Sequence, residues 1–267
     1  MPSRSDFLSL APELTNLAAQ AGRLILELAD GEIDLRTKAD ASPVTAADVQ
    51  AEDMILEALG RILPGVPILA EESAARGAVP PVGTDFVTID PLDGTREFIA
   101  GRPEYTVNIG LIADGRPVLG VLHAPALGKT YWGAPGHGAF RATHKKGALP
   151  HPDGFEPIHT RLAVSSPVAL TSRGHNDEAT ECFLDNLGAQ ERQRLGSAYK
   201  FALVAEGSAD IYARFVGTME WDTAAGEALL AAAGGAVLTP EGQPLAYGKT
   251  GAAYVNGPFI AWGRPPA

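Results

Sequence analysis

The stretch Asp85-Phe-Val-Thr-Ile-Asp-Pro-Leu-Asp-Gly-Thr-Arg-Glu-Phe-Ile99 leads from an apolar strand into a short helical pattern. The strand is expected to end at Asp90, because Pro91 has no N–H to donate to a sheet. Asp93 follows, and two carboxylates at a strand end can share a hard cation such as Mg²⁺. The N–H groups of the next residues, Gly94-Thr95, open a helix and suit a phosphate oxygen. An Asp-Gly turn with a helix N-cap explains this motif equally well when it is taken alone.

The spacing of the two aspartates argues against an aspartate nucleophile. Phosphatases that form a covalent aspartyl-phosphate carry a D-x-D pattern, with carboxylates two residues apart. Asp90 and Asp93 are three residues apart. Covalent catalysis by an aspartate is therefore the weaker interpretation.

The composition is that of a folded, soluble protein with one large domain or two small ones. Of the 267 residues, 45% are hydrophobic and 20% are charged, which is ordinary for globular proteins and wrong for disorder. The net charge of −11 argues against a general electrostatic grip on polymeric nucleic acid. The single cysteine, Cys182, excludes an internal disulfide, and its place on an apolar helix face predicts a buried thiol.

No stretch predicts membrane insertion or secretion. No apolar run approaches the roughly 20 residues needed to cross a bilayer, and residues 1–14 lack the uninterrupted apolar region of a signal peptide. We therefore expect a cytoplasmic protein without a transmembrane segment. Peripheral association with the inner face of the cell membrane stays open, as does the choice between a monomer and a homodimer.

Turn residues divide the chain into two halves. Residues 143–160 hold three prolines and two glycines and no hydrophobic period. We place the boundary in this stretch, with an α+β domain over residues 1–150 and an α/β domain over residues 151–267.

Hydrophobic periodicity predicts the main elements of each half. Residues 7–30 and 46–62 have helical spacing, and Asp114-Gly115 between two β-rich runs predicts a hairpin within residues 105–141. The other expected elements are strands at 67–70, 86–89, 161–165, 209–214 and 235–239, and helices at about 176–188, 197–206 and 221–233. Most histidines lie in or near loops without metal-ligand spacing, and we interpret them as surface or structural residues: His123, His137, His144, His151 and His159.

Two further acidic signals lie at the ends of predicted elements. Ile68-Leu-Ala-Glu-Glu-Ser73 ends a short strand in two carboxylates, and Trp221-Asp-Thr-Ala-Ala225 opens a helix with an aspartate. Each is weak alone, because a glutamate pair after a strand is commonly a solvated loop and an aspartate before a helix is commonly an N-cap.

Together, three motifs in order carry a family resemblance. Asp90–Thr95, the upstream Glu71–Ser73 and Trp221–Ala225 resemble the paired signatures of the inositol monophosphatase superfamily, the lithium-sensitive, magnesium-dependent phosphatases. The resemblance runs from about residue 20 to residue 240. It implies an α/β fold, the layered αβαβα sandwich of the inositol monophosphatase and sugar phosphatase type.

Within this superfamily the chain is most similar to the 3′(2′),5′-bisphosphate nucleotidases of the CysQ type. Gly196–Arg214, followed by Glu220–Ala225, resembles their nucleotide-binding signature, and Arg96–Ile99 resembles their variant of the first motif. Ser172-Arg-Gly-His175 departs from the Ser-Arg-Ser-His of that family, which leaves the role of this loop open.

The resemblance implies a role for each matched residue. Asp48, acting through Thr95, would position or deprotonate the attacking water. Repulsion among several gathered carboxylates calls for cations, and two or three Mg²⁺ ions would supply them. The implied metal ligands are Glu71, Asp90, Asp93, Asp222 and the carbonyl of Leu92, and the implied substrate-binding residues are Asp93, Gly94, Thr95, His175, Ser197, Lys200, Arg214 and Asp222.

The implied activity is that of a Mg²⁺-dependent phosphomonoesterase of sulfur metabolism. It would remove the 3′-phosphate of 3′-phosphoadenosine 5′-phosphate (PAP) and leave AMP. An inositol monophosphatase or a promiscuous sugar phosphatase on the same fold is the alternative. Lys200 and Arg214 favour a bisphosphate, because a second phosphate needs cations away from the metals. A sensor without catalysis is disfavoured, because no matching catalytic position is substituted.

Overall fold

The structure, a computed structural model, describes residues 4–29, 35–37, 43–162, 165–175 and 177–265. Up to residue 158 its elements are α1 (Arg4–Ser9), α2 (Ala11–Ala29), β1 (Leu35–Thr37), β2 (Pro43–Thr45), α3 (Ala46–Ile62), β3 (Ile68–Ala70), α4 (Glu71–Ala75), β4 (Phe86–Asp93), α5 (Thr95–Ile99), β5 (Thr106–Ala113), β6 (Arg116–Ala124), η1 (Pro125–Leu127), β7 (Lys129–Ala134), β8 (Gly138–Thr143), η2 (Pro152–Gly154) and β9 (Phe155–Ile158). The later elements are β10 (Val168–Ser172), α6 (Glu178–Asn186), β11 (Glu191–Leu195), α7 (Tyr199–Ala205), β12 (Ile211–Arg214), β13 (Thr218–Met219), α8 (Glu220–Ala232), β14 (Ala236–Leu238), η3 (Thr250–Ala252), β15 (Val255–Asn256) and β16 (Phe259–Trp262).

Two large sheets organise these elements. The first has the order β3-β4-β5-β6-β7-β8-β9, with β3 parallel to β4 and the other neighbours antiparallel. The second has the order β11-β10-β12-β16-β14, in which β10 runs parallel to both of its neighbours. The sheets are therefore mixed, and the functional motifs lie at strand ends and helix starts.

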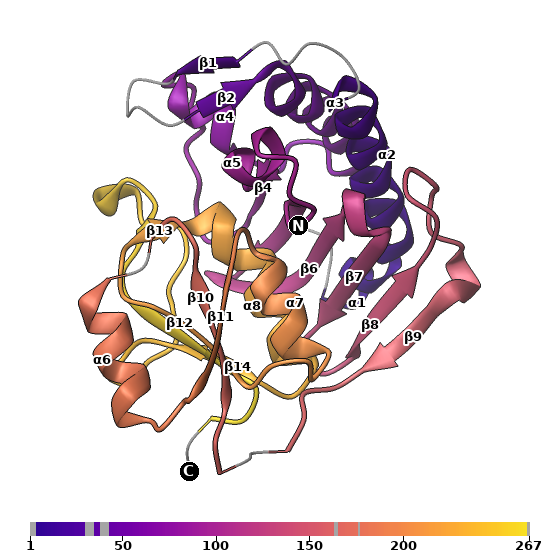
Figure 1. The fold of residues 1–267 in the computed structure, drawn as a ribbon. Coiled ribbons are helices and arrows are strands. Elements are labelled where there is room, and N and C mark those ends of the chain that lie inside the picture. Colours follow the sequence, from indigo (N-terminus) through magenta and orange to yellow (C-terminus); the bar gives the residue numbers. More distant parts are fainter. Residues whose placement is uncertain (1–3, 30–34, 38–42, 163–164, 176, 266–267) are drawn as a thin grey trace.

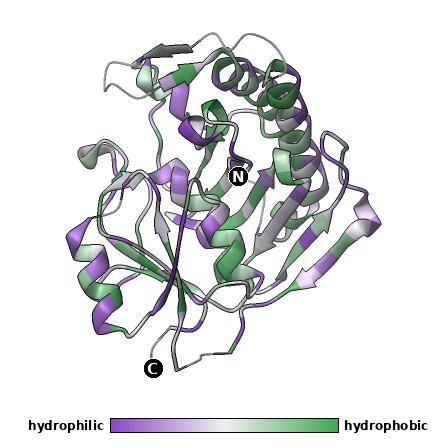
Figure 2. Cartoon of the chain, viewed as in Figure 1, coloured by the Kyte–Doolittle hydropathy of each residue, from purple (hydrophilic) through white to green (hydrophobic). Residues whose placement is uncertain are grey.

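Helices separate and cover the sheets in five layers (Figure 1). Helices α2 and α3 pack on one face of the first sheet, where Leu14, Ile25 and Ile55 are fully buried. Helices α7 and α8 lie between the two sheets, and α6 covers the outer face of the second. Figure 2 shows the hydrophobic residues concentrated along α2 and α3, whereas α6 alternates between hydrophobic and hydrophilic residues. This arrangement confirms the layered αβαβα sandwich.

Small residues bring α8 close to the first sheet. A Cβ atom on Gly120 of β6 would lie 2.1 Å from the carbonyl oxygen of Ala225, and one on Gly110 of β5 would lie 2.9 Å from Cβ of Ala224. Only glycine permits so close an approach of helix backbone to strand. The packing fixes the first turn of α8, which carries Asp222, above the end of the sheet.

In the first half, periodicity predicted the elements well and their boundaries less well. The α3 helix and the Asp114-Gly115 hairpin are confirmed, and both turn residues have positive φ (52° and 68°). The single helix expected over 7–30 is wrong, because the chain turns at Leu10 and Pro12 occupies the first turn of a new helix, α2. Its expected end at Gly31 lies outside the described residues. The expected end of the strand at Asp90 is also wrong: β4 continues to Asp93, with a register break between the two aspartates.

In the second half, the strand expected at 161–165 is absent from the positions that the structure describes there, and β10 begins at Val168 instead. Strand β9, within residues 151–267, pairs with β8 and completes the first sheet; the division into two domains stays a prediction.

The expected burial of Cys182 is wrong as well. Cys182 is exposed rather than buried, because Leu184 takes the inward position on α6. His123 lies in strand β6, buried, with its Nδ1 2.9 Å from Oγ1 of Thr130, so its role is structural. Among the described residues, no helix has both the length and the apolar character to span a membrane.

Candidate active site

Parallel pairing of β3 with β4 brings the first two acidic motifs together. Ala70 is paired with Ile89 across these strands, so the next residues, Glu71 and Asp90, lie side by side. Asp90 is buried, and its pKa is raised well above the usual value by burial and by the neighbouring carboxylates of Glu71, Asp93 and Asp222. The carboxylates of separate motifs thus form one cluster.

Asp93 connects the two halves of the molecule. Its Oδ2 accepts hydrogen bonds from Nδ2 of Asn108, at 3.3 Å, and from the backbone N–H of Ala198. Burial and the charge of Asp222 raise the pKa of Asp93 to about 7, while Lys200 and these two donors oppose the rise.

Asp222 completes the cluster from the start of α8. It is the third residue of that helix, and its Oδ2 accepts a hydrogen bond from the N–H of Met219 at 2.9 Å and another from the hydroxyl of Thr218. Carboxylate oxygens of Asp90, Asp93 and Asp222 all lie within 4.8 Å of one another. The orientation of Asp222 is therefore fixed by local bonds before any ligand binds.

This donor set fits a hard divalent cation. The atoms that converge are carboxylate oxygens, the ligands that Mg²⁺ prefers, and the set contains no soft donor. Two unit charges about 4 Å apart repel by about 4 kcal/mol at an effective dielectric constant of 20. Protons or cations must offset that repulsion. The raised pKa values of Asp90 and Asp93 show the same effect, because the neighbouring carboxylates favour the protonated form of each. The carbonyl oxygen of Leu92, which lies between these two aspartates in sequence, is 3.3 Å from Oγ1 of Thr95.

Asp48 and Thr95 form a hydrogen-bonded pair next to the acidic cluster. Asp48 is the third residue of α3, and its Oδ2 accepts hydrogen bonds from the N–H (2.7 Å) and the hydroxyl (2.6 Å) of Thr45. Its other oxygen, Oδ1, accepts a 2.9 Å hydrogen bond from the hydroxyl of Thr95. Because that proton points at Asp48, the lone pairs of the Thr95 oxygen remain available to accept a proton.

Gly94 places the start of α5 between the two halves. Its φ of 97° lies in the left-handed region that favours glycine. A Cβ atom there would lie 3.3 Å from Cβ of Tyr105 and 3.4 Å from Cβ of Ser197, one residue from each half. A side chain at this position would be strained by the positive φ and crowded by Tyr105.

Cationic side chains line the opposite wall, which comes from the second half. Lys200 is buried, and its Nζ donates to the carbonyl oxygens of Ser197 (2.5 Å) and Leu195 (3.3 Å). Burial lowers its pKa to about 7, although the carboxylate of Asp93 raises it. Burial also lowers the pKa of His175, and the nearby Arg214 guanidinium adds to this effect.

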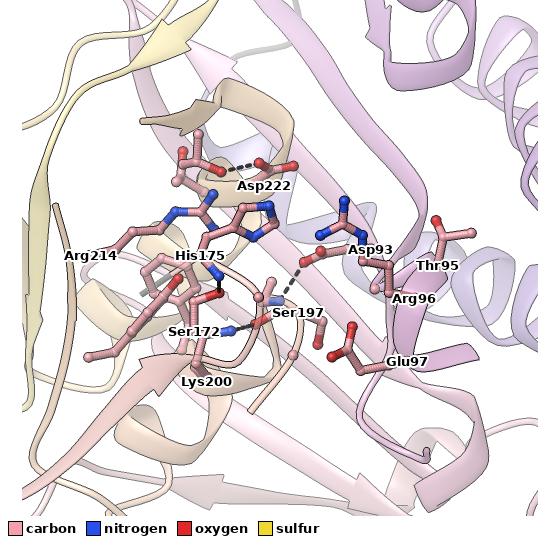
Figure 3. Close-up of a pocket in the computed structure, with 18 of the residues that line it drawn as sticks. Asp93, Thr95, Arg96, Glu97, Ser172, His175, Ser197, Lys200, Arg214 and Asp222 are labelled. Atoms are coloured by element: carbon pink, nitrogen blue, oxygen red, sulfur yellow. Dashed lines mark hydrogen bonds between the residues drawn. The ribbon is translucent and has the colours of Figure 1, made fainter. Parts of the chain in front are cut away.

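One pocket unites most of the residues that the sequence predicted (Figure 3). Asp90, Leu92 and Asp48 are not part of its lining: all three are buried, and Asp48 contacts the lining through its hydrogen bond with Thr95. Figure 3 shows Asp93, Thr95 and Arg96 on one side of the pocket and Arg214 and Lys200 on the other. The predicted residues in the lining are Glu71, Asp93, Gly94, Thr95, His175, Ser197, Lys200, Arg214 and Asp222.

Sequence analysis missed the residues that orient the carboxylates. Asn108 binds Asp93 and Thr218 binds Asp222. Asn108 becomes a neighbour only through the pairing of β4 with β5, and Thr218 lies in the two-residue strand β13, which has no recognisable sequence signature. Thr45 was detectable, because Thr-x-x-Asp before a helical period is a capping-box pattern.

Comparison with known proteins decides the family. A profile of the inositol monophosphatase family matches residues 9–262 of the 267 residues. The chain belongs to the inositol monophosphatase family. Only a few residues at each end lie outside the match, so the residues that line both walls of the pocket fall within the part of the chain that the family profile matches.

Similar members of this family include proteins named as bisphosphate nucleotidases and proteins named as inositol monophosphatases. The chain is 40% identical over 237 residues to the 3′(2′),5′-bisphosphate nucleotidase CysQ of Escherichia coli, covering 88% of this chain and 92% of that protein. The crystal structure of CysQ from Bacteroides thetaiotaomicron has a TM-score of 0.77 at 33% identity and covers 94% and 96% of the two chains. An inositol monophosphatase from Anabaena has a TM-score of 0.74 at 30% identity, covering 97% and 91%.

Proposed function

We propose that this protein is a Mg²⁺-dependent 3′(2′),5′-bisphosphate nucleotidase that hydrolyses PAP to AMP and phosphate. The observation that carries the proposal is the pocket itself, which opposes an acidic cluster with a basic wall. Asp90, Asp93 and Asp222 suit a metal-bound phosphate, and Lys200 and Arg214 suit a second anion. Relatives about 40% identical over most of the chain are bisphosphate nucleotidases by name, which supports the same substrate class here.

Two or three Mg²⁺ ions are proposed to be held by Glu71, Asp90, Asp93, Asp222 and the Leu92 carbonyl. When bound, they would neutralise the carboxylates, polarise the phosphoryl group and acidify a water molecule. The carboxylates themselves are prepared for that task. Asp93 is held by Asn108 and Ala198, and Asp222 by Thr218, so little reorganisation is needed.

The chain's own proton relay is proposed to run from the attacking water through Thr95 to Asp48. The water donates a hydrogen bond to Oγ1 of Thr95, which directs a water lone pair at phosphorus. As the O–P bond forms, the water proton passes to Oγ1 and the hydroxyl proton of Thr95 passes to Oδ1 of Asp48, 2.9 Å away. The bond from phosphorus to the ester oxygen breaks, and that oxygen takes a proton from solvent water as AMP leaves. Asp48 then releases its proton to solvent.

The wall from the second half is proposed to recognise the part of the substrate that is not cleaved. Ser197 lies just before α7, Lys200 is the second residue of that helix, and Arg214 ends β12. An inositol monophosphate has no second phosphate, so it gains nothing from these cations. This contrast is why we favour a bisphosphate nucleotide over the inositol monophosphatase alternative. We also propose a cytoplasmic location, to which the exposed free thiol of Cys182 is suited.

Product analysis tests this proposal. We expect the purified protein to release inorganic phosphate from PAP in millimolar Mg²⁺ and to form AMP, identified by chromatography, with no release in excess chelator. Li⁺ should inhibit the reaction by competing for an oxygen-lined cation site. Release of adenosine 3′-phosphate instead of AMP, or turnover that survives complete chelation, would contradict the proposal.

A further inference from the structure

The two cations that the family resemblance assigns to the substrate are already engaged with the backbone. Two of the three Nζ donors of Lys200 are directed at the carbonyls of Leu195 and Ser197, and its ammonium lies 4.8 Å from the ring centroid of Tyr212. Lys200 therefore offers a substrate only its remaining donor. The guanidinium of Arg214 is engaged in the same way: it donates from Nε to the carbonyl of Val216 and from Nη2 to the carbonyl of Gly217, at 3.1 and 3.2 Å.

Arg96 is in a different state. It is the second residue of α5, it lines the same pocket, and its side chain is exposed. Across the part of the chain that the structure describes, no carboxylate or carbonyl forms an ion pair or a hydrogen bond with its guanidinium. All five of its N–H donors are available to a ligand.

The guanidinium of Arg96 reaches across to the second half of the molecule. Its Nη1 lies 3.5 Å from the point where a Cβ atom on Gly174 would stand, so the loop after β10 approaches it closely without a side chain in between. Figure 3 shows the guanidinium extending from α5 into the pocket, toward the ring of His175.

His175 lies under the influence of two arginines from opposite walls. Its pKa is lowered first by burial, then by the charge of Arg214 and then by that of Arg96. Lys200 adds to this positive charge and the carboxylate of Asp222 opposes it. The three cations give this side of the pocket a local positive potential in a protein whose net charge is −11. An anion placed beside this ring would relieve that potential.

We propose that Arg96 is a specificity-determining residue that binds the substrate phosphate that is not cleaved, opposite Arg214. The inference rests on the proposed function, since it assigns a residue to the second phosphate of the same substrate. The cleaved phosphate is proposed to be held by the metal ions of the acidic cluster and by the start of α5. The second phosphate has no metal ion and needs cationic side chains with free donors. A planar guanidinium with all donors free binds phosphate in a bidentate manner.

Substrates with and without the second phosphate test the role of Arg96. We would compare kcat/KM for PAP and for 3′-AMP, which carries only the cleaved phosphate, in the wild type, R96Q and R102Q. Arg102 is an exposed arginine just after α5 that does not line the pocket, so R102Q removes the same charge without the same contact. R96Q should lower kcat/KM for PAP about 10- to 100-fold and change that for 3′-AMP less than twofold. R102Q should change neither value more than twofold.

A binding measurement separates this inference from the proposed function. AMP carries only the phosphate that is not cleaved, and its Kd can be measured by calorimetry whether or not the wild type hydrolyses PAP. R96Q should weaken AMP binding about tenfold or more and R102Q less than twofold. Equal losses on PAP and 3′-AMP, or an unchanged Kd for AMP in R96Q, would overturn the inference. Failure of the wild type to hydrolyse PAP would instead count against the proposed function.

Discussion

Arg173 ties the α5 region to the end of β10 through buried carboxylates. Its Nη1 lies 3.1 Å from Oε1 of Glu97, while Nη2 forms an ion pair with Glu104 and donates to the carbonyl of Arg194 at 3.0 Å. The side chains of Glu97 and Glu104 are only 10% and 9% exposed. The guanidinium therefore neutralises charge that water reaches poorly.

We predict that Arg173→Gln lowers the free energy of unfolding by about 3 kcal/mol. Removing one partner of a buried ion pair costs about 3–5 kcal/mol, because the other charge stays buried without it. The Arg173 side chain is 29% exposed, so solvent screening places the loss at the lower end of that range. At about 2 °C per kcal/mol for a chain of this size, Tm should fall by about 6 °C.

Thermal unfolding followed by circular dichroism, without added metal, measures this loss. The matched control is Arg61→Gln, which removes an ion pair with Glu57 of 2.6 Å whose side chains are 68% and 75% exposed. That pair should be worth less than about 1 kcal/mol. Adding Glu97→Gln to Arg173→Gln should recover part of the loss, because one buried charge disappears. A Tm change for Arg173→Gln no larger than that of Arg61→Gln would refute the reasoning.

Three further outcomes follow from the structure. Asp90→Asn should lower turnover at least 100-fold while leaving the metal-free Tm equal or higher, and Mg²⁺ should no longer raise Tm in this variant, as calorimetry would show. Thr95→Ala and Asp48→Asn should each lower kcat strongly with KM nearly unchanged, and together cost little more than either alone; additive losses would exclude the relay. Burial raises the pKa of Glu227 to about 7, so its contribution to stability is complete below about pH 4.5 and is lost as pH rises to about 7. Glu227→Gln should abolish that decline of up to about 3 kcal/mol in pH-dependent unfolding, and an unchanged pH profile would show that the carboxyl titrates normally.

Local signals in the sequence predicted the elements in which the pattern of apolar and polar residues, or a pair of turn residues, reflects which side chains are buried. Helix α3 and the hairpin between β5 and β6 have clear periodicity or turn chemistry. Strand β11 does not: its sequence, Glu-Arg-Gln-Arg-Leu, is polar because it lies at the edge of the second sheet and its side chains are largely exposed. Backbone pairing with β10 stabilises it, and no alternation of apolar residues announces such pairing.

The candidate site divides in the same way. The aspartates and Thr95 belong to motifs that a family resemblance identifies from residue order alone. The contacts that orient them depend on tertiary structure: Ala198 reaches Asp93 across 105 positions of sequence. Arg96 belongs to the motif Arg96–Ile99, but the sequence does not show that its donors are free. Only the structure distinguishes it in this respect from Lys200, whose Nζ donates to two backbone carbonyls.

The ratio of kcat/KM for PAP to that for inositol 1-phosphate, measured on the wild-type protein in saturating Mg²⁺, tests the central claim most directly. Both substrates present a phosphate monoester to Asp90, Asp93 and Asp222, and only PAP presents a second phosphate to Lys200 and Arg214. Two charge-assisted contacts to that phosphate, at about 1.5 kcal/mol or more each, correspond to a ratio of at least about 100 in favour of PAP. A ratio near or below one would contradict the account and make the protein an inositol monophosphatase or a general sugar phosphatase.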